Sequence, residues 1–186
     1  MDLQGITLVS VGYIGEIFLK SVAEAAAREF CLQVNTREGY IDISEYFDPT
    51  RRQYNGTRLL KEIDTLFASD NTKTIGLFSV DLFIPILTFI FGQAYLNGRS
   101  GIASYYRLSN ERYGMEPDSI LVAERFQKEV IHELGHTFGL VHCHVPTCVM
   151  RSSTYVEDID QKDVSICSHC RTLLSETIPS FSNYKT

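Results

Sequence analysis

The first 83 residues alternate between strand-like and helix-like hydrophobic patterns. A β-branched apolar run at residues 6–12 predicts a buried strand. Apolar residues then recur every three or four positions over residues 14–30 and 57–68, which predicts two amphipathic helices. Two further strands are predicted at residues 31–35 and 73–83. Because strands and helices alternate along the chain, we expect an α/β fold with crossover connections and a partly parallel sheet.

The second half of the chain predicts one long helix preceded by short strands. Strands are predicted at residues 89–91 and 102–106, the second after a glycine-containing turn. Residues 48–56 and 109–116 are polar and are predicted to be loops. Apolar residues at helical spacing predict a helix from about residue 118 to residue 138.

Length, composition and charge indicate a globular protein of about one domain. The chain has 186 residues, of which 44% are hydrophobic, and its net charge of −6 argues against nucleic-acid binding through a basic surface. The longest apolar stretch, residues 82–92, contains Pro85 and is shorter than the ~20 residues that a membrane helix needs, so we expect no membrane partner. Residues 1–5 do not resemble a secretion signal, so we expect a cytoplasmic protein. We also expect it to be a monomer. The polar residues 181–186 are predicted to fray.

The predicted long helix carries the pattern H-E-x-x-H-x-x-G-x-x-H. His132 and His136 are four residues apart and share one helix face, so both imidazoles can reach one metal ion. His142 is the candidate third ligand, because Gly139 can end the helix and redirect the chain. Three protein ligands that leave a position for water are typical of catalytic zinc. Glu133 is then placed to act as a base on that water.

Four of the five cysteines follow this pattern. An intracellular chain keeps thiols reduced, so the cluster predicts a closed, structural four-cysteine zinc site made by Cys143, Cys148, Cys167 and Cys170. Disulfides, a redox C-x-x-C pair, or replacement of one cysteine by His144 or His169 are the alternatives. The site would stabilise the loop-rich residues 143–170. Cys31 has no partner in sequence and is interpreted as a small buried residue.

The run HELGHTFGLVHC at residues 132–143, followed by Cys148, Met150, Cys167 and Cys170, resembles the archaemetzincins. The matching identities cover about forty residues, and the cysteine extension separates this pattern from those of astacins, reprolysins and matrix metalloproteinases. The resemblance implies a compact zincin fold with a mixed, mainly parallel, twisted sheet flanked by helices. It also implies one domain, with an upper part at residues 1–138 and a zinc-stapled C-terminal part at residues 139–186.

The resemblance further assigns roles by position. Met150 would be the Met-turn residue, and Glu133 would be the general base and acid. Residues 102–106 are our candidate for the edge strand that pairs with extended substrate. Ser152 stands where some metzincins carry an extra tyrosine ligand, so none is expected. Two zinc ions are implied, a catalytic one on His132, His136 and His142, and a structural one on Cys143, Cys148, Cys167 and Cys170.

These expectations converge on a zinc metalloprotease that hydrolyses peptide bonds in a peptide or protein substrate. Cleavage inside a chain and cleavage at its amino terminus both stay open, because no anchor for a free amine can be named. Glu116 and Asp118 lie roughly 20 Å from His132 along the predicted helix. The alternative function is a zinc-stabilised binding or regulatory module with little proteolytic activity. A redox or metal-buffering protein that uses Cys167 and Cys170 is a more distant alternative.

Overall fold

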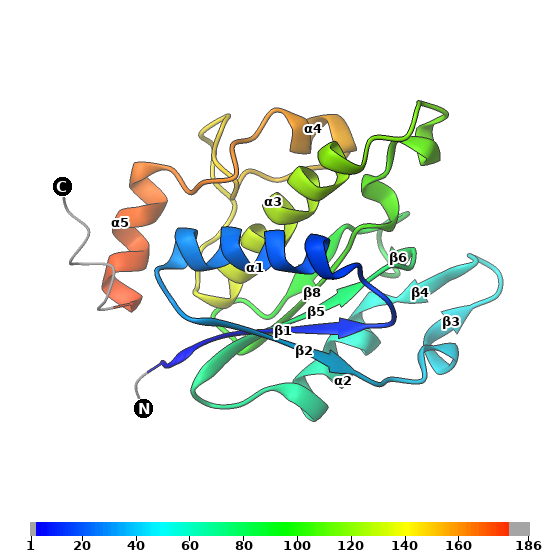
Figure 1. Ribbon diagram of the computed structural model, residues 1–186, viewed down its shortest axis with the longest axis horizontal. Helices are drawn as coiled ribbons and strands as arrows, with labels where there is room; N and C mark the ends of the chain where they lie inside the picture. The colour runs from blue at the N-terminus through cyan, green and yellow to red at the C-terminus, as the bar shows by residue number, and fades with distance from the viewer. Residues whose placement is uncertain (1–2, 179–186) are drawn as a thin grey trace.

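A five-stranded sheet forms the centre of the computed structural model, which describes residues 3–178 (Figure 1). Strands β1, β2, β5 and β8 run parallel to one another, and β7 is antiparallel to β8. The predicted mixed, mainly parallel sheet is therefore confirmed. The strand order is β2-β1-β5-β8-β7, with β1 at Gly5–Val11, β2 at Val34–Gly39, β5 at Thr72–Phe78, β7 at Gly92–Ala94 and β8 at Ser100–Ser104.

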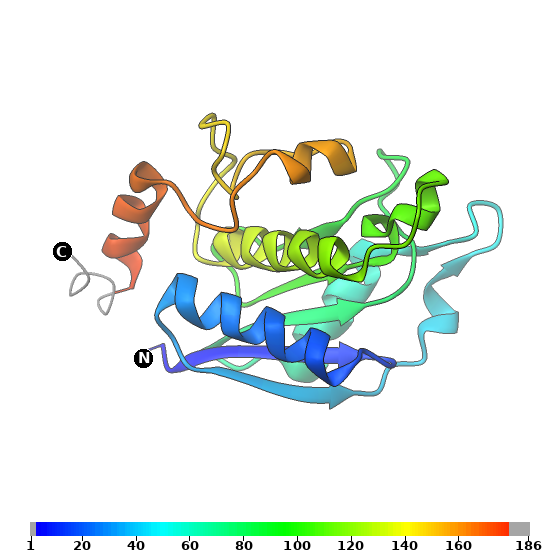
Figure 2. The same cartoon turned by 45° about the horizontal axis from the view of Figure 1, so that its top comes forward.

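Helices cover both faces of this sheet (Figures 1 and 2). Helices α1 (Glu16–Phe30) and α3 (Ser119–Thr137) lie on one face, and α2 (Gly56–Phe67) lies on the other. Side chains alternate across a strand, so β1 supplies both cores. Ile6 and Leu8 are buried in the core that contains residues of α1 and α3, whereas Val9 and Val11 are buried in the core that contains residues of α2.

A second, three-stranded sheet comprises β3 (Phe47–Asp48), β4 (Gln53–Asn55) and β6 (Leu82–Phe83). The prediction of a loop at residues 48–56 is therefore wrong in part, because β3 and β4 form an antiparallel pair there. The strand predicted at residues 73–83 is divided between the two sheets. The chain leaves the large sheet after Phe78, and the Asp81 carboxylate accepts a 2.6 Å hydrogen bond from Arg107 Nε before β6 begins.

Two predicted strands begin later than expected. Cys31 caps the end of α1 in the left-handed conformation, with φ 52°, so β2 starts only at Val34. Of residues 89–91, Ile90 makes an isolated bridge to Leu82, and the strand β7 follows them.

The prediction of an edge strand at residues 102–106 is wrong. The strand found there, β8, is an interior strand between β5 and β7. The chain turns at Asn97, which has φ 53°, and this turn places β7 antiparallel to β8 at the edge of the sheet. The edge that faces solvent and the cleft is therefore β7.

The C-terminal part contains more helix than its loop-like composition suggests. Helices α4 (Val156–Asp160) and α5 (Ser168–Thr177) follow α3.

Short 3₁₀ turns occur earlier in the chain, namely η1 (Ile43–Tyr46), η2 (Tyr106–Leu108) and η3 (Asn110–Tyr113). The fraying predicted for residues 181–186 lies outside the described residues. No helix within residues 3–178 combines the length and the apolarity needed to cross a bilayer.

Candidate active site and metal centres

Helix α3 places two of the predicted histidines side by side. The helix starts at the Asp118 cap, whose carboxylate accepts a 2.9 Å hydrogen bond from the Leu121 amide. His132 and His136 lie one turn apart near its other end, with their Nε2 atoms 3.1 Å apart. Gly139, with φ 93°, then redirects the chain in a conformation that favours glycine. This turn brings His142 to the same place as the two helical histidines.

The three imidazoles are oriented as a metal-binding set. One ring nitrogen from each of His132, His136 and His142 lies within 4.8 Å of the others. The Val149 carbonyl lies 2.8 Å from His132 Nδ1, and the Leu140 carbonyl lies 2.7 Å from His136 Nδ1. Because a carbonyl can only accept, each Nδ1 carries the proton and each Nε2 keeps its lone pair for a metal. Burial lowers the pKa of all three histidines, which favours the neutral form that binds metal.

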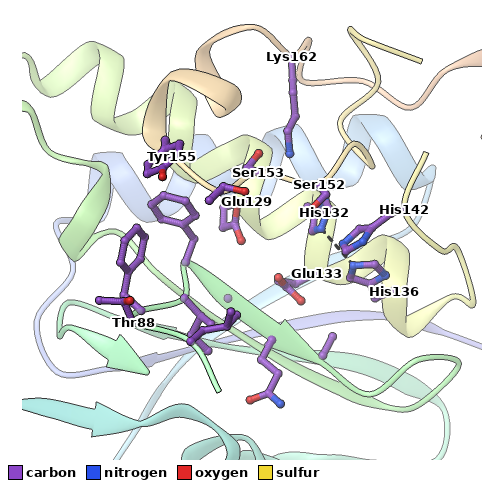
Figure 3. A pocket seen from close by; sticks show the side chains of 18 residues that line it. Thr88, Glu129, His132, Glu133, His136, His142, Ser152, Ser153, Tyr155 and Lys162 are labelled. Atoms are coloured by element: carbon purple, nitrogen blue, oxygen red, sulfur yellow. Dashed lines mark hydrogen bonds between the residues drawn. The ribbon is translucent and has the colours of Figure 1, made fainter. Parts of the chain in front are cut away.

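Glu133 lies beside this set and points into a cavity (Figure 3). Glu133 is only 4% exposed, and its Oε2 atom has no hydrogen-bond partner among residues 3–178. Gly92 of β7 lies against this carboxylate, since a Cβ there would lie 2.7 Å from Glu133 Oε1. Burial raises the pKa of Glu133 well above 4.5, and the charge of Glu129 adds to the rise, whereas Lys162 opposes it.

The cavity is about 550 Å³ in volume and separates the edge of the sheet from the C-terminal part. Residues 87–94, which include β7, line one side, and residues 152–155 line the other. Helix α3 contributes Glu129, Glu133 and the two helical histidines to its lining (Figure 3). A cavity of this size, bounded by a free strand edge and an unpartnered carboxylate, can receive a segment of polypeptide.

Two cavity residues were not predicted from the sequence. Glu129 lies one helical turn before Glu133, and that i, i+4 spacing could have identified it. Lys162 reaches the cavity from the segment after α4, and no pattern in the sequence indicates this.

Met150 is fully buried and packs against the backbone of α3 below the histidines. A Cβ at Gly135 would lie 2.3 Å from Met150 Sδ, so the close approach requires glycine at this position. The Cys143 amide donates a 2.9 Å hydrogen bond to the Met150 carbonyl, which joins the chain after His142 to the chain around Met150.

The four clustered cysteines also converge. The ligand sulfurs of this group all lie within 4.8 Å of one another, with 3.8 Å between Cys143 and Cys167 and 4.0 Å between Cys148 and Cys170. Zinc–sulfur bonds of ~2.3 Å in a tetrahedron place sulfurs about 3.8 Å apart, so the spacing fits a closed zinc site. A disulfide requires about 2.05 Å, and all five cysteines of the chain are free.

The remaining candidates lie outside this cluster. His144 and His169 are exposed and do not belong to either metal-ligand group found within residues 3–178. Cys31 is half-buried at the end of α1, where its Sγ lies 3.7 Å from the Arg28 carbonyl. Burial raises the pKa of the Cys148 and Cys170 thiols, so a metal ion would have to displace their protons.

Comparisons with known proteins point to one family of peptidases. The sequence profile described as "Peptidase family M54" matches residues 15–176. A protein named archaemetzincin from Thermococcus kodakarensis is 35% identical over 175 residues, which cover 91% of this chain and 94% of that protein. The crystal structure of a zinc-dependent peptidase from Methanocorpusculum labreanum is similar with a TM-score of 0.82 and 29% identity, and the match covers 91% of this chain and all of that one. Archaemetzincin from Methanopyrus kandleri gives a TM-score of 0.80 with 31% identity over 94% of this chain and 96% of that one.

Proposed function

This chain belongs to peptidase family M54, the archaemetzincins, and is a zinc-dependent metallopeptidase; from that premise we propose which of its residues perform the reaction. His132, His136 and His142 hold the catalytic zinc, and Glu133 moves the proton. The observation that carries this proposal is the buried, unpartnered Oε2 of Glu133 beside three convergent imidazoles in an open-sided cavity. The alternative of a zinc-stabilised binding module is left without support.

The roles of the residues follow from their positions. Bound zinc supplies Lewis acidity, which lowers the pKa of water toward ~7 and polarises the scissile carbonyl. The carbonyls of Val149 and Leu140 keep His132 and His136 turned toward the ion. Glu133 accepts the proton of the attacking water and delivers it to the leaving amine. Met150 supports the backbone of α3 beneath the histidines.

A second zinc ion is proposed at Cys143, Cys148, Cys167 and Cys170. The sulfur separations of 3.8 and 4.0 Å support a tetrahedral four-thiolate set, which leaves no position for water. The ion has a structural role, because it connects the chain after His142 to α5. The active unit comprises residues 1–138 and the C-terminal residues 139–186. We place it as a monomer in the cytoplasm, where five free cysteines stay reduced.

The substrate is a peptide or protein segment that lies in extended form along β7. Residues 92–94 line the cavity and form the edge of the sheet, so their backbone groups are available for strand pairing. The segment would then lie between β7 and residues 152–155, with its scissile bond next to Glu133.

The decisive experiment measures zinc content and cleavage of a peptide library by wild type, Glu133→Gln and Glu133→Ala. We expect about two zinc ions per chain in all three proteins, because Glu133 is not a ligand. Cleavage by the variants should fall about 10²–10⁴-fold, the usual contribution of general acid–base catalysis. Equal turnover by wild type and Glu133→Gln on a cleaved peptide would contradict the role given to Glu133.

A further inference from the structure

Two charged side chains in the catalytic cavity have no role in the reaction as described so far. Lys162 and Glu129 both line the cavity, and they are only 4% and 5% exposed, respectively. Figure 3 shows Lys162 pointing toward α3, on which Glu129 and Glu133 lie. Ionised groups are seldom buried without a compensating partner, because leaving water is costly.

Lys162 is held at a fixed place by a backbone carbonyl. Its Nζ donates a 3.3 Å hydrogen bond to the Val149 carbonyl. The same oxygen accepts the hydrogen bond from His132 Nδ1 at 2.8 Å. The ammonium group is therefore fixed on the inner wall of the cavity, next to the histidine that starts the metal-binding set.

Glu129 lies one helical turn from the catalytic carboxylate and lines the same cavity. It precedes Glu133 by four residues on α3, so the two side chains share one helix face. Both carboxyl groups line the same cavity as Lys162, whose positive charge favours the ionised form of each. Two neighbouring carboxylates in a buried cavity repel each other strongly unless a positive charge compensates them.

We propose that Lys162 is a positioning residue for Glu133: its positive charge compensates the two buried carboxylates of Glu129 and Glu133, which would otherwise repel each other. The inference rests on the proposed role of Glu133. The two charged residues that the sequence did not predict then act together, Glu129 from α3 and Lys162 from the segment that follows α4. Without Lys162, the carboxylate of Glu129 would repel the carboxylate of Glu133 and displace it from its position in the cavity.

The test is a double-mutant cycle on the zinc-loaded, full-length protein, with Lys162→Met, Glu129→Gln and the double variant. The measured quantities are kcat per bound zinc, KM and the midpoint of thermal unfolding, on a peptide that wild type cleaves. Lys128→Met is the matched control. Lys128 Nζ also donates to a carbonyl of the C-terminal part, that of Ile159 at 3.2 Å, but Lys128 does not line the cavity.

Charge compensation predicts a non-additive result. Lys162→Met should lower kcat per bound zinc by at least about tenfold and change KM by less than about threefold, because ground-state binding of the peptide is not its task. The double variant should recover to within about threefold of Glu129→Gln, since the uncompensated carboxylate is gone. Its unfolding midpoint should lie above that of Lys162→Met although it carries one more substitution. Lys128→Met should keep the wild-type kcat.

Two results would overturn the inference. The first is a Lys162→Met protein with the wild-type kcat per bound zinc. The second is a double variant that is slower and less stable than either single variant, which would indicate a packing role. Glu133→Gln, measured in the same series, separates the two proposals. If it cleaves as fast as wild type, the proposed function of Glu133 fails; if it is inactive while Lys162→Met is fully active, only the present inference fails.

Discussion

Gly135 shows how little room the active site leaves around its histidines. It lies on α3 between His132 and Gly139, and Met150 approaches its backbone directly. The sequence shows this glycine only as one of the unspecified positions in the histidine motif. The structure gives the reason for it, because a side chain there would occupy the place of Met150 Sδ.

Replacing Gly135 by alanine should therefore destabilise the protein despite the better helix propensity of alanine. The added Cβ would lie 2.3 Å from Met150 Sδ, and overpacking of this kind typically costs about 1–3 kcal/mol. Denaturant unfolding of the zinc-loaded protein measures the loss. Gly15→Ala is the control, since a Cβ at Gly15 meets nothing within 4 Å and should change stability by less than about 1 kcal/mol. Equal stability of Gly135→Ala and wild type would contradict the close contact.

At the scale of elements, the β7–β8 turn holds the end of the active-site helix. The Asn97 amide donates a 2.8 Å hydrogen bond to the His136 carbonyl. Lys73 Nζ donates to the carbonyls of Gly98 and Thr137, at 2.8 and 2.9 Å. The last turn of α3 leaves carbonyls without the usual helical partners, and these contacts bind two of them, those of His136 and Thr137. The turn thereby fixes the direction in which the chain leaves toward His142.

Lys73 should also make stability depend on pH in a defined direction. Burial lowers the pKa of Lys73 below its ordinary value of 10.5. Between the lowered pKa and 10.5 the unfolded chain binds more protons than the folded one, so the free energy of unfolding rises with pH. The free energy of unfolding of wild type minus that of Lys73→Met should therefore increase as the pH rises toward 10.5. A difference that falls over this interval would contradict the assigned sign.

The loop that carries the third histidine connects the two proposed metal centres. His142 is followed at once by Cys143, whose amide bonds the Met150 carbonyl, and Cys148 precedes Met150 by two residues. Since Val149 also orients His132, the cysteine cluster fixes groups on both sides of the catalytic set. The two centres are therefore expected to depend on each other.

Cys167→Ser should weaken zinc binding at the catalytic site as well as at the cysteine site. Loss of one thiolate opens the structural centre, and the freed loop then holds His142 less firmly. Zinc content after dialysis against a graded chelator series should fall for both ions, with the catalytic affinity lowered about 10–100-fold, as for other residues that support ligands. Cys31→Ser is the control outside the cluster and should keep both ions. Unchanged catalytic affinity in Cys167→Ser would show that the centres are independent.

The elements that the sequence predicted well are those whose own residues determine them. Helices α1, α2 and α3 were predicted within a few residues, because each has an apolar face at helical spacing and α3 has the Asp118 cap. The edge position of β7 was missed because three residues carry no clear period, and strand order is decided by pairing between distant segments. Helix α5 was also missed. It starts at Ser168, directly after a cysteine of the metal cluster, in a stretch whose composition is typical of a loop.

At the scale of the whole molecule, the histidine and cysteine sets could be predicted because ligand spacing is local chemistry. Both sets converge in the structure at the predicted residues. Glu129 and Lys162 could not be assigned together, because 33 positions separate them and only the packing of the C-terminal part on α3 brings them into one cavity. That packing combines a shared apolar core with long-range ion pairs, and one sequence does not reveal these pairings.

One such ion pair joins α3 to α4. Arg125, only 2% exposed, donates two 2.7 Å hydrogen bonds to the Asp160 carboxylate. It also donates to the Leu108 carbonyl at 2.7 Å and to Asn110 Oδ1 at 2.9 Å. Glu29 of α1 makes a comparable link, because it accepts hydrogen bonds from the Ile166 amide and from Arg171. These two ion pairs therefore help to attach the C-terminal part to residues 1–138.

Arg125→Met should loosen the wall of the cavity that carries residues 152–155 and Lys162. Four acceptor atoms lose the donor that the buried guanidinium provides, so we expect the free energy of unfolding to fall by about 2–4 kcal/mol. The kcat for peptide cleavage should fall with it. Lys20→Met removes one side of an exposed i, i+4 pair and should change stability by less than about 0.5 kcal/mol. Matching unfolding curves for Arg125→Met and Lys20→Met would contradict this attachment.

The Val149 carbonyl, which accepts from both His132 and Lys162, has a consequence for how the site can change by mutation. A substitution of Val149 changes the side chain but keeps the backbone carbonyl that accepts these two hydrogen bonds. Sequence variation at this position is therefore filtered by packing alone, since Val149 is fully buried, and not by its part in orienting the histidine. A saturation scan of the cleft would score position 149 as an ordinary core residue. Only substitutions of its two donors, His132 and Lys162, would reveal the role of this carbonyl.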